Sequence, residues 1–107
     1  MKKGEIWIIE FPFKDGREQR GMRPALVLAD TKTDLIIVIP LTSNFQALRF
    51  PYTLEIKKSE INNLEKDSIL LIFQLQALDR KRFISIIGEF EKDYIEKLEN
   101  IMKELFK

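Results

Sequence analysis

The sequence predicts a mainly β fold of the α+β class: a small twisted sheet or half-open antiparallel barrel with a C-terminal amphipathic helix. Six or so short runs are rich in β-branched and aromatic residues and are separated by turn residues. The last seventeen residues then change to a helical period. Parallel βαβ units are not expected, because no crossover helix of adequate length lies between the early runs. At 107 residues, the chain is expected to form one domain, residues 1–107.

The expected strands follow from apolar runs and their punctuation. They span residues 5–11, 23–30, 34–41, 52–56, 67–74 and 83–89. Pro12 ends the first, and Pro24 opens the second. The polar stretch 30–34 is short enough to make the second and third strands an antiparallel hairpin. Ser59 is expected to cap a short helical turn that ends at Leu64.

The C-terminal segment has the pattern of a helix from residue 91 to about residue 106. Its apolar residues fall three, four or seven apart, with Glu and Lys between them. They are Phe90, Tyr94, Leu98, Ile101, Met102 and Leu105. A small domain needs such a helix to cover one side of its core, so we expect this face to pack on the sheet rather than on a partner.

Composition excludes several function classes. Apolar residues make up 45% of the chain and charged residues 33%, as in a folded globular protein. The absence of Cys and His removes disulfides, thiolate chemistry and the usual zinc ligands, so no metal or cofactor is expected. No apolar run is long enough to span a bilayer and no leader pattern opens the chain, so we expect a cytoplasmic protein. A net charge of +1 argues against a uniformly basic surface, although basic residues cluster at 14–23 and 80–82.

The most informative stretch is residues 16–24, Gly-Arg-Glu-Gln-Arg-Gly-Met-Arg-Pro. One interpretation is a solvated loop whose charges keep a sheet edge soluble. Two details favour a site instead. Arg23 directly precedes Pro24 and a core strand, so its backbone is anchored, and Glu18 can orient its guanidinium through a charge-assisted hydrogen bond. A rigid arginine with an acidic orienting partner suits phosphate recognition.

The segment 40–44, Pro-Leu-Thr-Ser-Asn, follows the third strand and by itself is typical of a turn or helix cap. The hairpin makes it more informative. The start of one antiparallel strand lies beside the end of the next, so Arg23 and Thr42 should be neighbours at roughly 5 Å, one inter-strand spacing.

An arginine and a hydroxyl without His suit a substrate that carries its own nucleophile, such as RNA with its 2′-hydroxyl. Arg23 would stabilise charge on the phosphorane, and Thr42 would donate a hydrogen bond to a non-bridging oxygen. Glu18 is the carboxylate in the loop placed to accept a proton.

The sequence resembles the MazF/PemK toxins. The most specific element is Glu-Gln-x-Gly-x-Arg-Pro-Ala-Leu-Val at residues 18–27. Supporting elements run in order through nearly the whole chain. They are Lys-Gly-Glu-Ile-Trp at 3–7, Pro-Leu-Thr-Ser at 40–43, Asp-Ser-Ile-Leu-Leu at 67–71 with Gln74, Leu-Asp-Arg-x-Arg at 78–82 and Ile-Gly at 87–88.

This resemblance implies a half-open barrel of the MazF/CcdB type and a homodimeric toxin. It implies a metal-independent endoribonuclease that cleaves single-stranded RNA or mRNA to 2′,3′-cyclic phosphate and 5′-hydroxyl ends. It also implies a cognate antitoxin whose acidic, partly disordered tail covers the groove. The family's essential arginine, hydroxyl and glutamate match Arg23, Thr42 and Glu18. The residues expected to contact RNA are Arg17, Gln19, Arg20, Ser43, Asn44, Gln74 and Gln76.

Two positions depart from the family pattern. Phe73 stands where many members carry an acidic residue, and Gln76 stands where a basic residue is common. These changes favour an alternative in which the barrel is a non-catalytic interaction protein, such as a CcdB-like inhibitor of a protein target or an antitoxin-binding module. The joint presence of Glu18, Arg23 and Thr42 favours the nuclease.

Sequence preference in RNA is expected to come from the loops at 11–22, 44–51 and 60–67. Three aromatic residues, Phe45, Phe50 and Tyr52, either stack on unpaired bases or pack within the protein.

Overall fold

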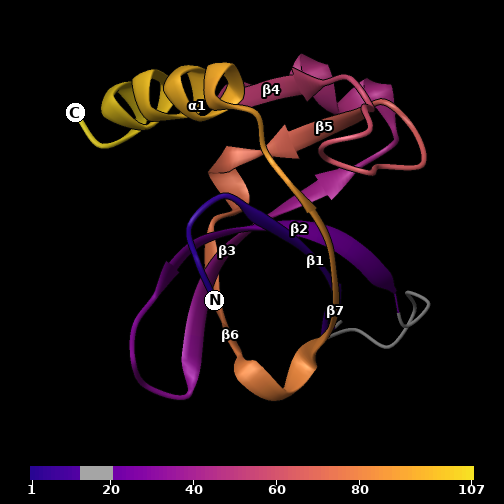
Figure 1. Cartoon of the computed structure of the whole chain (residues 1–107). Coiled ribbons are helices and arrows are strands. Elements are labelled where there is room, and N and C mark those ends of the chain that lie inside the picture. The colour runs from indigo at the N-terminus through magenta and orange to yellow at the C-terminus, as the bar shows by residue number, and fades with distance from the viewer. Residues whose placement is uncertain (13–20) are drawn as a thin grey trace.

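The computed structural model describes residues 1–12 and 21–107. One antiparallel sheet of seven strands dominates it, with the path β4-β5-β3-β2-β1-β7 and with β6 also paired to β3 (Figure 1). The elements are β1 Glu5–Glu10, β2 Met22–Asp30, β3 Leu35–Thr42, β4 Thr53–Ile56, β5 Ser68–Leu71, β6 Gln76–Asp79, β7 Phe83–Glu89 and α1 Lys92–Leu105. Among the described residues, no pairing joins β6 to β7, so the barrel stays half-open as predicted.

The central hairpin β2–β3 is antiparallel, as its sequence predicts. Its apolar runs are continuous because both faces are buried. Leu26 and Ile39 belong to the cluster on the helix side of the sheet. Val27 and Val38 belong to a second cluster inside the barrel. Alternation along two strands thus supplies both halves of the core.

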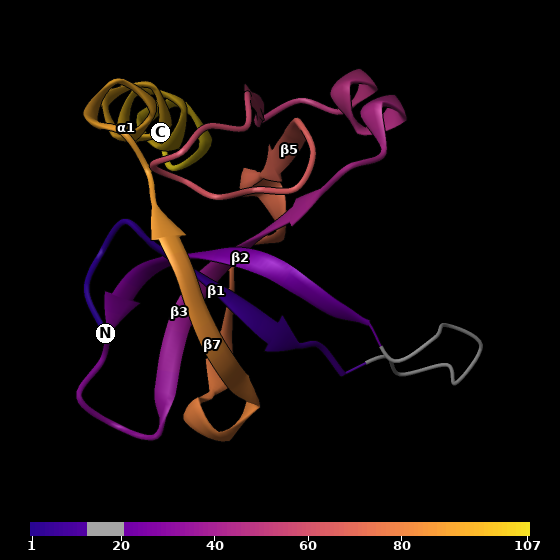
Figure 2. The same cartoon turned by 45° about the vertical axis from the view of Figure 1, so that its right-hand side comes forward.

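Helix α1 lies beside β4 and β5 at one end of the molecule, and β1, β2, β3, β6 and β7 curve together at the other end (Figure 1 and Figure 2). These five strands supply most residues of the second cluster. Glu91 is the N-terminal cap residue of α1 and Phe106 its C-terminal cap residue, which confirms the predicted bounds. Leu98 is fully buried. The neighbouring apolar residues Tyr94, Ile101, Met102 and Leu105 pack against the same cluster. The helix therefore completes the core, as expected.

One of the predicted strands was too long, and one predicted turn was found. The strand expected at 67–74 ends at Leu71, a 3₁₀ turn over Ile72–Gln74 follows, and β6 begins at Gln76. No Gly or Pro marks this corner, so the apolar run hides it. The predicted capped turn after Ser59 is present: Ser59 Oγ accepts from the backbone amides of Ile61 and Asn62 at 3.2 and 3.1 Å, and the Asn63 amide donates to the Ser59 carbonyl at 2.9 Å, although the turn does not extend into a helix.

The segment that follows β3 forms a helix cap, as its Ser, Thr and Asn residues by themselves indicated. Asn44 Oδ1 accepts from the Gln46 amide at 3.0 Å and caps the 3₁₀ helix η1, Phe45–Arg49. Phe45 and Phe50 are each 42% exposed and Tyr52 is 36% exposed, so these aromatics are not core residues.

In the described ranges, no helix has both the length and the apolar character needed to cross a membrane.

Candidate functional site

The candidate site lies where β2 begins and β3 ends. Arg23 pairs with Ile9 on β1. The pairing of β2 with β3 ends at Ala25–Pro40, two residues from Arg23 on one strand and two residues from Thr42 on the other. Thr42 itself pairs with Ile69 on β5. Arg23 and Thr42 are both half-buried, and both line the same two cavities. The structure therefore brings together the two residues that the hairpin argument paired.

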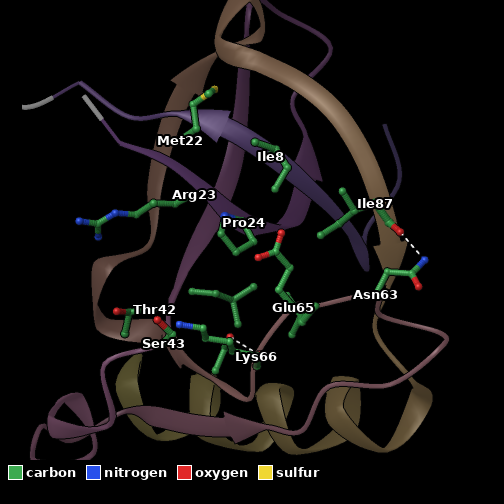
Figure 3. Close-up of a pocket in the computed structure, with 13 residues that line it drawn as sticks. Ile8, Met22, Arg23, Pro24, Thr42, Ser43, Asn63, Glu65, Lys66 and Ile87 are labelled. Atoms are coloured by element: carbon green, nitrogen blue, oxygen red, sulfur yellow. Dashed lines mark hydrogen bonds between the residues drawn. The ribbon is translucent and has the colours of Figure 1, made fainter. Parts of the chain in front are cut away.

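The larger cavity has a volume of about 590 Å³ and lies between the start of β2 and the connection from β4 to β5. Its apolar wall comprises Ile8, Met22, Pro24, Leu41, Leu64 and Ile87. Its polar lining comprises Arg23, Thr42, Ser43, Asn63, Glu65, Lys66 and Ser68. In Figure 3, the Glu65 carboxylate extends toward Pro24 and the Lys66 side chain extends toward Ser43. The cavity thus presents a carboxylate and an ammonium group over an apolar wall.

The smaller cavity, of about 190 Å³, lies on the side of Arg23 and Thr42 that faces η1 and the corner after β5. Phe50 and Phe73 line it, with ring centroids 5.5 Å apart. The Arg49 guanidinium lies 4.9 Å from the centre of the Phe50 ring. This side therefore offers exposed aromatic faces and a cation next to the arginine–threonine pair.

The connection that carries Glu65 and Lys66 is held from behind by Asn62, which is fully buried. Its Oδ1 accepts from the amides of Ser59 and Leu64 at 2.9 and 3.1 Å. Its Nδ2 donates to the Lys57 carbonyl at 2.9 Å and to Glu91 Oε1 at 3.3 Å. A buried amide with all of these partners fixes the backbone around it.

Gly88 on β7 allows this connection to approach the sheet. A Cβ atom there would lie 2.6 Å from the carbonyl oxygens of both Ile61 and Asn62. Asn63 adopts a positive φ of 53°, which Asn tolerates, and its Nδ2 donates to the Ile87 carbonyl at 2.7 Å. The sequence analysis did not single out Asn62, Glu65 or Lys66. The only sequence signal was the assignment of 60–67 as a variable recognition loop.

The other predicted site residues divide into three groups. Arg17, Glu18, Gln19 and Arg20 lie outside the described residues. Ser43 lines the larger cavity, while Asn44 and Gln74 line the smaller one. Gln76 lines neither, and its Nε2 donates to the Gln74 carbonyl at 3.1 Å.

The basic run at 80–82 lies far from these cavities, by the turn between β2 and β3. Arg80 donates to the two oxygens of Asp30 at 2.8 and 3.1 Å and to the Thr33 carbonyl at 2.6 Å. These hydrogen bonds hold the pKa of Asp30 well below its usual range and raise that of Arg80. Arg80 is thus committed to a contact within the chain. In the described part of the chain, no three His, Cys, Asp or Glu side chains gather as a metal-binding group.

Fold and site together define a class of protein: a half-open antiparallel barrel with a helix across one end and an arginine–hydroxyl pair between two cavities. A family model for the PemK-like, MazF-like toxins of type II toxin–antitoxin systems matches residues 2–106, and the chain belongs to this family.

Individual relatives agree with this assignment. The chain is 29% identical over 86 residues to a protein named endoribonuclease MazF from Staphylococcus saprophyticus, covering 77% of this chain and 71% of that protein. It also resembles a solved mycobacterial endoribonuclease in complex with its cognate antitoxin. That match has a TM-score of 0.66 at 13% identity and covers 94% of this chain and 86% of the other, which supports the fold.

Proposed function

We propose that this chain is a toxin endoribonuclease that cleaves single-stranded RNA without a metal ion. The observation that carries the proposal is that Arg23 and Thr42 both line the same two cavities. Membership of the MazF-like toxin family and the relative named endoribonuclease MazF support the same activity. The chain has no His to act as a base and no Cys to act as a nucleophile. In the proposed reaction the RNA therefore supplies the nucleophile, its own 2′-hydroxyl.

The chemistry that fits is attack by the ribose 2′-oxygen on the adjacent phosphorus. The 2′-O–P bond forms, the P–O5′ bond breaks, and the products carry a 2′,3′-cyclic phosphate and a 5′-hydroxyl. Arg23 stabilises the negative charge of the phosphorane, and the Thr42 hydroxyl donates to a non-bridging oxygen. Glu18 takes the proton of the 2′-hydroxyl, and a water molecule gives a proton to the leaving 5′-oxygen.

Single-stranded RNA suits the two cavities because unpaired bases can turn toward the protein on either side of the reacting phosphate. Phe50 and Phe73 are partly exposed beside Arg23 and offer faces for a base to stack on. Ser43, Asn44 and Gln74 line the path of such a strand and supply polar contacts. Arg17, Gln19, Arg20 and Gln76 complete the proposed set of RNA-contacting residues.

The proposed protein partners are a cognate antitoxin and a second copy of the chain. One solved structural neighbour is an endoribonuclease in complex with its cognate antitoxin. Arg23 and Arg49 line one cavity, and an acidic, partly disordered antitoxin tail would be attracted to them and would block RNA. The family resemblance supports the homodimer.

The test is cleavage of a long single-stranded RNA in EDTA, with end mapping of the products. Wild type should give cyclic-phosphate and 5′-hydroxyl ends, and Arg23→Ala should give none while remaining folded by circular dichroism. Lys58→Ala is the control, since Lys58 is an exposed cation that lines neither cavity. The proposal fails if wild type does not cleave RNAs of varied sequence, or if Arg23→Ala cleaves like wild type.

One observation favours a second function. Phe73 is 39% exposed and pairs with Phe50 beside Arg23, at a position where many family members carry an acid. An apolar pair at this place suits a non-catalytic module that binds an antitoxin or another protein target. A folded wild-type protein that binds its antitoxin but cleaves no RNA would establish this alternative.

A further inference from the structure

The larger cavity contains two charged side chains, Glu65 and Lys66, that the proposed chemistry does not use. Both are exposed, and both extend into the cavity (Figure 3). Among the described residues, neither side chain has a hydrogen bond or an ion pair, and they do not pair with each other. Adjacent opposite charges that line one cavity without neutralising each other are available to a ligand that presents both donors and acceptors.

The place of this cavity limits what that ligand is. It shares Arg23 and Thr42 with the smaller cavity, so the reacting phosphate lies at its mouth under the proposed function. A nucleotide next to that phosphate is therefore within reach. The volume of about 590 Å³ lies in the range of small-molecule sites. Pro24, Leu64 and Ile87 give the cavity an apolar wall that can contact the face of a base.

The two charges then select among the bases. A carboxylate only accepts hydrogen bonds and an ammonium only donates them. Guanine has two adjacent donors, N1–H and the N2 amino group, and two acceptors, O6 and N7. Adenine and cytosine place an acceptor nitrogen next to their single amino group, which repels a carboxylate. Uracil has one N–H between two carbonyl oxygens. Only guanine offers a carboxylate two adjacent donors and also offers an ammonium group an acceptor, whereas adenine and cytosine offer the carboxylate a single amino donor.

We propose that the larger cavity recognises a guanine adjacent to the scissile phosphate. The Glu65 carboxylate accepts from N1–H and the N2 amino group, and Lys66 donates to O6 or N7. This inference rests on the proposed nuclease function and adds a base specificity to it. An acidic peptide in the same cavity would meet the charge of Glu65, which disfavours a protein segment as its occupant.

Cleavage of a randomised RNA pool, with sequencing of the new ends, tests the proposal first. Wild type should enrich guanine at one of the two positions that flank the cut. Replacement of that guanine by inosine removes only the N2 amino group and should lower kcat/KM on the order of 10-fold, with 100-fold as the upper end. In Glu65→Ala, guanine and inosine substrates should be cleaved at equal rates. Glu60→Ala is the matched control, since Glu60 is exposed in the same connection but lines neither cavity.

The outcomes separate this inference from the nuclease proposal. Wild-type cleavage without guanine at either flanking position, or an inosine penalty that survives in Glu65→Ala, overturns the guanine site and leaves the nuclease standing. If wild type cleaves nothing, binding decides instead. Fluorescence anisotropy with guanine- and inosine-containing single-stranded oligonucleotides should then show tighter guanine binding in wild type, and equal binding of the two in Glu65→Ala. Equal binding in wild type overturns the site.

Discussion

The central hairpin β2–β3 carries charged and hydroxyl side chains at both of its ends, and the two ends use them differently. At the turn end, Asp30 accepts from Arg80 and from the Lys32 amide and lies 3.5 Å from the N-terminal amine. At the open end, Thr42 lines two cavities, and Glu65 extends into the larger one. The first end satisfies its charges within the chain, while the second presents polar groups to a space that a ligand can enter.

This difference shows why charge alone does not identify a site. The run Asp-Arg-Lys-Arg at 79–82 is as basic as the loop before Arg23, but Arg80 is already bound to Asp30. An arginine that holds a carboxylate through two hydrogen bonds stabilises the fold and has little left to offer a phosphate. We therefore expect changes at the open end to affect cleavage, and changes at the turn end to affect stability.

The largest expected effect is on catalysis at the open end. Thr42→Ala should lower the single-turnover cleavage rate on the order of 100- to 1,000-fold, because one donor to the phosphorane is lost. Thr42→Ser should restore most of the rate, since it keeps the hydroxyl. The matched control is Thr31→Ala at the turn end, where the hydroxyl donates to the Leu35 carbonyl at 2.6 Å. The comparison is wrong if both alanine variants lose cleavage equally.

The second effect concerns the support of the larger cavity. Asn62→Ala should lower the free energy of unfolding by about 2 to 4 kcal/mol, because it leaves buried backbone groups without partners. Urea denaturation measures this loss. Asn100→Ala is the control, since Asn100 is exposed on α1, and it should change stability little. A loss of cleavage specificity with unchanged stability would show that Asn62 acts at the site and not as a support.

The third effect is a pH dependence confined to the turn end. Hydrogen bonds from Arg80 lower the pKa of Asp30 below its ordinary value of 3.8, so the ionised carboxylate stabilises the fold above that pH. The stabilisation is lost as the pH falls below about 3.8 toward the lowered pKa of the folded state.

Thermal unfolding of Arg80→Ala measures this dependence. Its Tm should be lower than that of wild type by a constant amount from pH 7 to pH 5, and the gap should narrow below pH 4. Lys81→Ala, an exposed neighbour, should follow wild type. Cleavage at pH 7 should be unchanged in both variants. A gap that stays constant down to pH 2 would contradict the role assigned to Asp30.

Much of the fold follows from the sequence because its period reports which faces are buried. The helix bounds and the β2–β3 hairpin were predicted from apolar spacing and one polar turn. The corner at Ile72–Gln74 was not, because Ile72 and Phe73 continue the apolar run of the strand before them, and no Gly or Pro marks the point where the strand ends.

The candidate site was predictable to the extent that it depends on neighbouring strands. The hairpin alone placed Arg23 beside Thr42. The contact between Asn62 and Glu91 joins residues 29 apart, and that between Asp30 and Arg80 joins residues 50 apart. Such partners are chosen by the packed fold, and no local pattern records them. The roles of Arg23, Thr42 and Glu18 in cleavage remain predictions that the variants above test.

The smallest expected effect is a gain in stability at the turn between β2 and β3, and it tests whether the two ends of the hairpin are independent. Lys32 has a φ of 65°, in the left-handed region that costs a residue with a side chain roughly 1 to 2 kcal/mol. Lys32→Gly removes this strain and keeps the backbone amide that donates to Asp30 at 2.8 Å. Because glycine also gains freedom in the unfolded chain, the net gain in unfolding free energy should be no more than about 1 kcal/mol. Urea denaturation should detect this gain. The cleavage rate should stay within about twofold of wild type, which corresponds to a change of about 0.4 kcal/mol in the activation free energy, because the turn is remote from the phosphate. A changed cleavage rate would show that the two ends of the hairpin are coupled, and the division between a stabilising end and a functional end would then fail.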